Sequence, residues 1–247
     1  MLNKNKIFCI ITARKNSKGL KGKNLKIINS KPLIFYPVNA AIKSKLIDKV
    51  FFNSDCQKMC SYIKKKFKDC VVFERPKFLS GDKISSYQVI NHQIQKLELN
   101  KQYTYFVLLE PTSPLTETND INNAIKKLIN NKKATSLISV CDTTRPNAFY
   151  SFKKKNKQYL RPLTNIKKFK LRRQDLPKTF YIDGSLYLSK VKSYLRYKTF
   201  IQAKTLFIIL KNFKNFQIDD YLDLQIIKML YRMFFLKKLK INNNRRN

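Results

Sequence analysis

A short segment near the N-terminus combines glycine with dense positive charge directly after an apolar run. Five cations fall within ten residues, with Gly19 and Gly22 between them: Arg14, Lys15, Lys18, Lys21 and Lys23. Glycine lets a backbone fold its N–H groups around an anion, and Lys and Arg side chains neutralise phosphate charge. The segment therefore indicates a polyphosphate-binding loop. The alternative is a solvated basic loop in a lysine-rich protein.

The position of this loop favours binding over mere solvation. The preceding run, Ile7 to Ile11, is rich in bulky and β-branched residues, which predicts a strand buried on both faces of a parallel sheet. Ligands of open α/β sheets bind just beyond the carboxyl ends of such strands. The loop matches neither the P-loop motif nor the GxGxxG fingerprint, so the common phosphate-binding motifs do not explain it.

The run from Arg14 to Asn24, RKNSKGLKGKN, resembles the signature of acylneuraminate cytidylyltransferases, also called CMP-sialic acid synthetases. Close relatives of these enzymes activate legionaminic and pseudaminic acids. The resemblance implies that CTP and a nine-carbon 2-keto sugar acid react to give a CMP-sugar and pyrophosphate. For this loop it implies that the catalytic cations are Arg14, Lys18 and Lys23, and that the nucleotide-binding residues are Ala13, Arg14, Ser17 and Asn24.

A second stretch, from Glu74 to Ser86, is predicted to stop one strand and start a helix. It resembles the family's RPxxLxxDxxSS pattern, which implies that Arg75 and Ser86 contact the nucleotide. The ordinary alternative is that Asp82 or Ser85 only caps the helix. Capping alone would not require the Arg-Pro pair, so a binding role is favoured.

A third stretch, EPTSPL, follows a predicted strand from Tyr103 to Leu109. Its two prolines hold the backbone rigid around two hydroxyls. It resembles the family's LLQPTSPLR, which implies that Glu110, Thr112 and Ser113 contact the sugar. Glu110 replaces the usual Gln and Thr116 the usual Arg. A carboxylate cannot donate hydrogen bonds as an amide does, so Glu110 indicates either a changed sugar pocket or tolerated variation. No residue stands out as a general base, and Glu110 is the candidate.

Regular alternation of strands and helices fails from about residue 142 to 177, where the chain is polar, basic and interrupted by prolines. In the family this region contributes to a dimer interface, which implies a homodimer. The resemblance also implies that Arg173, Tyr187 and Phe200 bind the sugar. An Arg fork suits a carboxylate, although Arg173 could be a generic surface residue. Two positions depart from the family: Asp183 replaces Asn, and Ala148 lies where a Lys is frequent.

Three of the 15 acidic residues lie within five positions near the C-terminal end: Asp219, Asp220 and Asp223. Mg²⁺ prefers hard oxygen ligands and usually takes some of them from substrate phosphates. The family pattern is Asp-Ile-Asp, and Gln217 stands at its first position. The metal ligand is therefore expected to be Asp219, with Asp223 less favoured and Asp220 able to help through water. Acids at a helix N-terminus are also favourable for capping alone.

The elements that position these residues alternate in a βαβαβ order, which predicts an α/β fold with a three-layer α/β/α nucleotidyltransferase (Rossmann-like) sheet. We expect one catalytic domain over residues 1–236, a dimerisation and sugar-binding excursion over about 142–190, and a basic tail over 237–247. The first helix is expected to begin at Pro32, and a later one at Asn119 or Asp120.

Composition sets outer limits on function. The chain has 52 Lys and Arg against 15 Asp and Glu, a formal charge of +37, which raises nucleic acid as a partner. No RNP, zinc-finger or KH motif supports that reading, and the lysines could reflect AT-rich coding DNA, so no specific nucleic acid is expected. The odd number of cysteines, five without a CxxC pair, argues against a disulfide framework or zinc site. Without a signal peptide or membrane span, we expect a cytoplasmic protein.

Two other functions stay open. One is a cytidylyltransferase for another sugar acid, such as 3-deoxy-manno-octulosonate. The other is a nonenzymatic polyanion-binding protein, which the high positive charge would suit.

Overall fold

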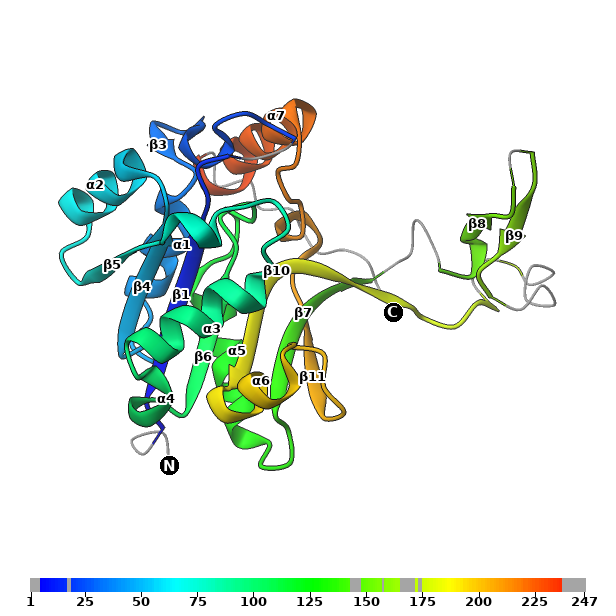
Figure 1. Ribbon diagram of the computed structural model, residues 1–247. Coiled ribbons are helices and arrows are strands. Elements are labelled where there is room, and N and C mark those ends of the chain that lie inside the picture. Colours follow the sequence, from blue (N-terminus) through cyan, green and yellow to red (C-terminus); the bar gives the residue numbers. More distant parts are fainter. Residues whose placement is uncertain are drawn as a thin grey trace.

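The computed structural model describes residues 5–16, 19–142, 148–156, 158–164, 172 and 175–236. These residues build a central seven-stranded sheet with the order β11-β7-β10-β6-β1-β4-β5 (Figure 1). Its strands are β1 (Ile7–Ala13), β4 (Lys49–Ser54), β5 (Cys70–Glu74), β6 (Tyr105–Leu109), β7 (Ser136–Asp142), β10 (Phe180–Lys190) and β11 (Thr205–Ile209). The expected α/β class is confirmed.

The sheet is parallel except at one strand. β1 pairs in parallel with both β4 and β6, as its apolar run predicted, whereas β10 runs antiparallel between β6 and β7. β10 reaches this place after the segment that follows β7. Residues 180–190 of the expected excursion therefore form part of the main sheet.

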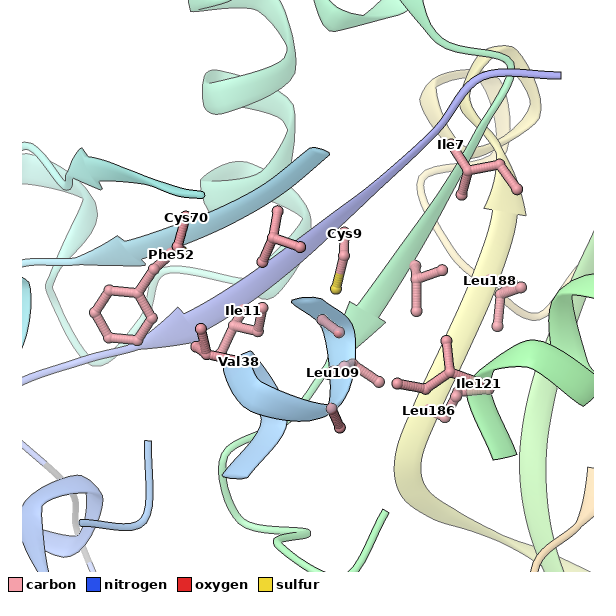
Figure 2. Packing of buried hydrophobic residues seen from close by; sticks show 14 of the residues in the cluster. Ile7, Cys9, Ile11, Val38, Phe52, Cys70, Leu109, Ile121, Leu186 and Leu188 are labelled. Carbon is pink, nitrogen blue, oxygen red and sulfur yellow. The ribbon is translucent and has the colours of Figure 1, made fainter. Parts of the chain in front are cut away.

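Helices cover both faces of the sheet and make it three-layered. Alternate β1 side chains point to opposite faces, so Ile7, Cys9 and Ile11 join one core cluster and Phe8 and Ile10 the other. The first cluster, part of which is drawn in Figure 2, is covered by α1 (Phe35–Ile42), α2 (Gln57–Lys66) and α5 (Thr118–Asn130). The second is covered by α3 (Ser86–Lys96), α4 (Leu99–Gln102) and α6 (Val191–Tyr197).

A third, smaller core cluster joins the N-terminal and C-terminal parts of the chain. It packs α7 (Tyr221–Tyr231) against a hairpin of β2 (Ile27–Ile28) and β3 (Lys31–Pro32) through Ile28, Leu33, Leu224 and Ile227. The remaining short helices are η2 (Lys23–Leu25), η3 (Lys77–Leu79), η4 (Ala148–Tyr150), η7 (Asn212–Lys214) and the π-helical η8 (Arg232–Leu236). This cluster brings the segment before α7 close to the loop after β1.

Two expected helix starts are wrong. Pro32 belongs to β3, where it pairs with Ile27, and α1 starts only at Phe35. The N-cap of α5 is Glu117, whose carboxylate forms a capping box with Asp120, so the helix begins before Asn119. The cap of α3 is Ser85, one of the two residues expected there, with Gln88 completing its capping box.

The segment between β7 and β10 carries the hairpin of β8 (Phe152–Lys154) and β9 (Leu160–Pro162), which stands away from the main sheet (Figure 1). Its apolar side chains are exposed, including Leu160 at 65% and Leu163 at 56%. None of the helices in the described parts of the chain has the length and apolar character needed to span a membrane.

The strand order also predicts where a ligand-binding crevice should lie. The chain passes from β1 to β4 and β5 on one side and later to β6 on the other side of β1. The loops that leave β1 and β6 therefore diverge at the carboxyl edge. Such a switch point is where open α/β sheets bind ligands.

Candidate active site

A pocket of about 420 Å³ opens at this carboxyl edge. Eight of the residues expected from the sequence line it: Arg14, Lys23, Asn24, Arg75, Ser86, Glu110, Thr112 and Asp219. They come from the loops after β1, β5 and β6, from the start of α3 and from the segment before α7. The pocket thus unites positions that are as much as 205 residues apart in the chain.

The loop after β1 is closed by its own polar groups. The Asn24 side-chain amide donates to the Arg14 carbonyl over 3.0 Å, and the Lys23 N–H donates to the Leu20 carbonyl over 3.0 Å. Gly22 adopts the left-handed conformation, with φ 65°, just before η2. Ser17 and Lys18, also expected to act here, lie outside the described residues.

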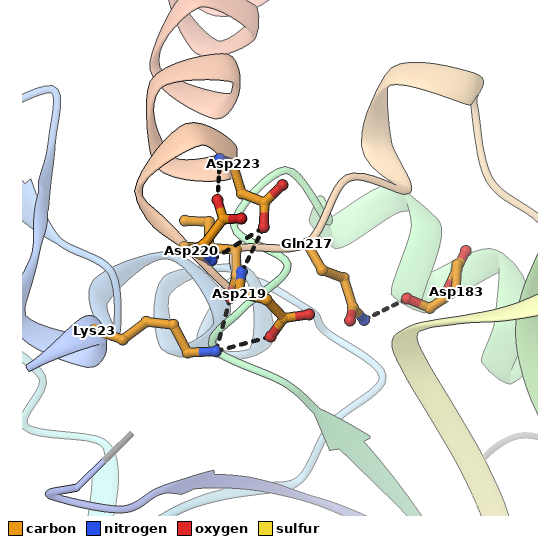
Figure 3. Close-up of polar contacts among 7 residues, drawn as sticks. Lys23, Asp183, Gln217, Asp219, Asp220 and Asp223 are labelled. Atoms are coloured by element: carbon orange, nitrogen blue, oxygen red, sulfur yellow. Dashed lines mark hydrogen bonds and ion pairs between the residues drawn. The ribbon is translucent and has the colours of Figure 1, made fainter. Parts of the chain in front are cut away.

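Lys23 connects this loop to the segment before α7, as Figure 3 shows. Its Nζ donates to the Ile218 carbonyl over 2.7 Å and lies 3.1 Å from Asp219 Oδ1. The Lys23 side chain is only 12% exposed, whereas that of Asp219 is 78% exposed. Gly19 packs closely against the same segment: a Cβ at this position would come within 2.2 Å of the Asp219 carbonyl oxygen. The loop after β1 and the expected metal ligand therefore form one wall of the pocket.

Arg75 is held by a residue that the sequence reasoning missed. Its Nε donates to Asn53 Oδ1 over 2.7 Å, and Asn53 in turn donates to Gln93 Oε1 over 2.9 Å. Burial lowers the pKa of the Arg75 guanidinium from its ordinary value. The signal available in the sequence was a polar Asn near the end of an otherwise apolar strand, together with Gln93 on the apolar face of a helix.

Asp82, the other candidate for the cap of α3, contacts the loop after β1 instead. Ser85 caps the helix, and Asp82 Oδ1 lies 2.8 Å from Arg14 Nη1. Both side chains line the pocket, together with Ser80 and Gly81 of the same loop. The loop after β5 thereby reaches across to the loop after β1 and closes one side of the site.

Glu110 lies at the exit of β6, among the basic residues. Burial raises the pKa of its carboxyl to about 7, while the charges of Lys23 and Arg75 act in the opposite direction. The pKa of Tyr187 on β10 is raised to about 12, first by burial and then by the charge of Glu110. Glu110 is thus near enough to Lys23, Arg75 and Tyr187 to interact with them electrostatically, although Tyr187 itself, an expected sugar contact, is not part of the pocket lining.

Several expected binding residues lie outside the pocket lining. Ala13 and Ser113 are buried, and Ser113 Oγ has no hydrogen-bond partner in the described part of the chain. Phe200 is a core residue, packed on Phe106, Tyr187 and Tyr194 with ring centroids 4.6–5.4 Å apart. Arg173 lies outside the described residues.

Of the three clustered aspartates, only Asp219 lines the pocket. Asp223 accepts hydrogen bonds from the N–H groups of Asp219 and Asp220, and Asp220 accepts from the Asp223 N–H (Figure 3). These contacts form the capping box of α7, so the capping role considered for the two residues is observed. Within the described ranges, no three His, Cys, Asp or Glu side chains are grouped in a way that could hold a metal ion.

Gln217 turns away from this group toward β10. Its side-chain amide donates to the Asp183 carbonyl, next to Gly184 with φ 73° (Figure 3). The Asp183 carboxylate is buried and accepts hydrogen bonds from Ser139 Oγ and the Ser185 N–H. The two departures from the family pattern, at positions 183 and 217, therefore lie in contact.

The site has the chemistry of a polyanion pocket. Lys23, Arg14 and Arg75 are brought to one cavity, and each is oriented by a specific acceptor. Asp219 presents an exposed carboxylate beside Lys23. Such a set can hold a triphosphate and a hard cation that accompanies it.

Comparison with known sequences identifies relatives along most of the chain. A family model described as cytidylyltransferase matches residues 8–241. An N-acylneuraminate cytidylyltransferase of Escherichia coli O18:K1:H7 is 27% identical over 98% of this chain, and the chain spans only 56% of that protein's length. A pseudaminic acid cytidylyltransferase of Campylobacter jejuni is 30% identical over 92% of this chain and 97% of its own.

Solved structures share the fold at low identity. A CMP:2-keto-3-deoxy-manno-octonic acid synthetase complexed with CTP superposes with a TM-score of 0.68 and 13% identity, covering 93% of this chain and 99% of its own. A 4-diphosphocytidyl-2C-methyl-D-erythritol synthase of Anaerococcus prevotii gives a TM-score of 0.65 at 11% identity, covering 94% of this chain and 98% of its own. Because the family model matches nearly the whole of this chain, the chain belongs to the cytidylyltransferase family.

Proposed function

We propose that this protein transfers CMP from CTP to the anomeric hydroxyl of a nonulosonic acid of the sialic, legionaminic or pseudaminic type, releasing pyrophosphate. The observation that supports this most is the link between Lys23 and Asp219, which joins a phosphate-binding loop to an exposed carboxylate inside one pocket. The relatives named above act on acylneuraminate or pseudaminic acid. The octulosonate enzyme shares the fold, so its substrate belongs in any test.

The reaction requires an in-line attack on the α-phosphorus, with negative charge developing on the phosphate oxygens and the leaving pyrophosphate. Lys23 and Arg14 are positioned to neutralise that charge, and their fixed partners reduce the reorganisation needed at the moment of reaction. Lys18 is proposed for the same task on the family pattern alone. Arg75 and Ser86 line the same pocket, and they would hold the nucleotide. Catalysis is then mainly positional and electrostatic.

Mg²⁺ is the cofactor that we propose, with Asp219 as its protein ligand. One exposed carboxylate fits this ion, because Mg²⁺ is usually bound by one or two carboxylates and takes further oxygens from substrate phosphates and water. When bound, the ion would offset phosphate charge. Asp220 and Asp223 are engaged in capping α7 and are therefore proposed to fix the start of that helix rather than to bind the metal directly.

We also propose a homodimer formed through the segment between β7 and β10. The β8–β9 hairpin and the start of β10 expose a concentration of apolar side chains, among them Tyr159, Leu160, Leu163 and Tyr181, each more than 45% exposed. Exposed apolar side chains concentrated on one segment are typical of protein interfaces. A second copy is the occupant that the family resemblance implies.

The experiment that tests the proposed function is a CTP-dependent pyrophosphate-release assay with sialic, legionaminic, pseudaminic and 3-deoxy-manno-octulosonic acids. We expect release with at least one nine-carbon acid, and loss of that release in Lys23→Ala. Lys21→Ala is the matched control, because Lys21 belongs to the same loop but is exposed and outside the pocket lining. Salt-sensitive adhesion to polyanions should stay nearly unchanged in both variants. Absence of product with every acid of the panel would show that the enzyme assignment is wrong.

A further inference from the structure

We propose that Glu110 is a catalytic residue that accepts the proton of the attacking hydroxyl. The inference rests on the proposed function, and it concerns a residue that departs from the Gln usual in the family pattern. A Gln side chain can accept a hydrogen bond from a hydroxyl, but it cannot take up its proton at neutral pH. The chemistry proposed for Glu110 is therefore a property of this chain.

Glu110 lies in the pocket in which the reaction is proposed to take place. It directly follows β6, the strand beside β1, and so lies at the switch point of the sheet. It lines the same pocket as Lys23 and Arg75, the two cations whose charges act on it most. A nucleotide held by these cations would have its phosphates beside the Glu110 carboxylate.

The other acids of the pocket are already paired. Asp82 lies 2.8 Å from Arg14, and Asp219 lies 3.1 Å from Lys23. Within the described part of the chain, Glu110 forms no ion pair as short as these. Its carboxylate is thus the one acidic group of the described pocket lining that is left to accept a proton from a substrate hydroxyl.

The surroundings of Glu110 also suit a base. The titratable and charged groups that face it are Lys23 from η2, Arg75 from the loop after β5, Tyr187 from β10 and Tyr194 from α6. The pKa values of both tyrosines are raised, so they stay protonated at neutral pH and do not compete for the proton. The pKa of Glu110 at about 7 is close to a physiological working pH, where a general base is most effective.

The proposed step balances in atoms and charge. The hydroxyl proton moves to a carboxylate oxygen of Glu110 while the hydroxyl oxygen forms its bond to the α-phosphorus. The bond between the α-phosphorus and the bridging oxygen breaks, and its electron pair leaves with pyrophosphate. After the products depart, Glu110 returns the proton to solvent. No oxidant, reductant or further reactant is needed.

Single-turnover kinetics of Glu110→Gln test this inference, because they follow the chemical step without product release. We expect the rate to fall about 10²-fold or more, as is typical when a general base is removed. The wild-type rate should decline below a pH of about 7, and this decline should be absent in the variant. CTP affinity should not fall, because Gln preserves the size of the side chain and removes a negative charge beside the phosphates. Glu98→Gln, at an exposed position on the surface, is the control and should match the wild type.

The outcomes separate the inference from the proposed function. A variant that keeps both the wild-type rate and the decline at low pH would overturn the role of Glu110 while leaving the transferase activity in place. A wild-type protein that releases no pyrophosphate with any acid of the panel would overturn both. If Glu110→Gln does not fold, Glu110→Asp serves instead. It keeps a carboxylate and should show a reduced rate with the pH decline retained, and a pH-independent rate would contradict the proposal.

Discussion

At the scale of single residues, two neighbouring aspartates have different tasks. Asp219 presents an exposed carboxylate to the pocket and contacts Lys23, whereas Asp220 accepts a hydrogen bond from the Asp223 N–H and caps α7. The sequence shows only a cluster of acids, and the hydrogen bonds distinguish the carboxylate that lines the pocket from the one that caps the helix.

This division leads to a prediction for Asp219→Asn and Asp220→Ala. An interaction with a charged group is worth about 1.5–3 kcal/mol, so Asp219→Asn should lower the gain in CTP affinity that Mg²⁺ provides by about tenfold or more. Asp220→Ala should leave that gain intact and lower the free energy of unfolding by about 1 kcal/mol through loss of the N-cap. Calorimetric titrations of CTP with and without Mg²⁺, together with urea unfolding, measure both effects. An unchanged Mg²⁺ gain in Asp219→Asn would argue against the metal assignment.

Glu110 should also affect stability in a pH-dependent way. Its pKa is about 7 in the folded protein against an ordinary value of 4.5, so the folded state holds a proton that the unfolded chain releases as the pH rises through this range. Stability therefore falls between pH 4.5 and 7, and the full cost, about 3 kcal/mol, applies above pH 7. Glu110→Gln should remove that cost. Its advantage in unfolding free energy should be largest near pH 8 and shrink toward zero near pH 4.5, and a pH-independent difference would contradict the burial of the charge.

At the scale of elements, two glycines of the loop after β1 serve different needs. Gly19 has an ordinary backbone conformation but lies against the Asp219 carbonyl, and a Cβ there would come within 2.2 Å of this oxygen. Gly22 has φ 65°, and a Cβ there would meet nothing within 4 Å. One glycine is therefore required by close packing of two segments, and the other by backbone geometry.

Alanine substitutions should separate these needs. Gly19→Ala forces the loop away from Asp219, because a backbone oxygen cannot move aside as a side chain can, and CTP affinity should drop about tenfold or more. Gly22→Ala should cost about 1–2 kcal/mol of unfolding free energy through backbone strain, with a smaller effect on CTP affinity. Nucleotide titration and urea unfolding of both variants provide the comparison. Equal losses of affinity in the two variants would contradict the close contact at Gly19.

Many of the strands and helices could be predicted from the sequence, because buried strands are recognisable as short apolar runs. The strands β1 and β6 were expected near their observed bounds, and Ser85 was one of the two residues expected to cap α3. The wrong start of α1 arose because Pro32 suits both a first helical turn and a β-hairpin. Only the pairing of Pro32 with Ile27 in the folded protein distinguishes the hairpin from the helix.

The pocket could be predicted less completely than the strands. Motif residues such as Lys23, Arg75 and Asp219 were expected and do meet in one pocket. The supporting residue Asn53 was missed, because its hydrogen bond to Arg75 joins two neighbouring strand ends that lie 22 residues apart in the chain. Phe200 was expected in the sugar site, yet it packs in the aromatic cluster around Tyr194, which no local pattern reveals.

At the scale of the whole molecule, the pocket and the proposed interface lie in separate places. The pocket opens at the carboxyl edge of the sheet, whereas the β8–β9 hairpin, which carries exposed apolar side chains, stands away from the sheet (Figure 1). The formal charge of +37 should speed the approach of CTP, and added salt should weaken this effect by screening the charge. The exposed apolar side chains of the segment between β7 and β10 are where the proposed second copy would bind.

Leu160→Asp tests the proposed dimer. Leu160 is 65% exposed on β9, and burying an aspartate in an interface is unfavourable, so the variant should sediment as a monomer at concentrations where the wild type is dimeric. Met229→Asp is the matched control, because Met229 is 64% exposed on α7, away from the proposed interface. A monomeric wild type, or a Leu160→Asp variant that stays dimeric, would contradict an interface at this hairpin.

The most direct test of the central claim is a crystal structure with CTP and Mg²⁺ bound. The account requires the triphosphate to lie in the pocket beside Lys23, with the metal ion between its oxygens and the Asp219 carboxylate. A nucleotide bound elsewhere on the protein, or one whose phosphates point away from both residues into solvent, would contradict it.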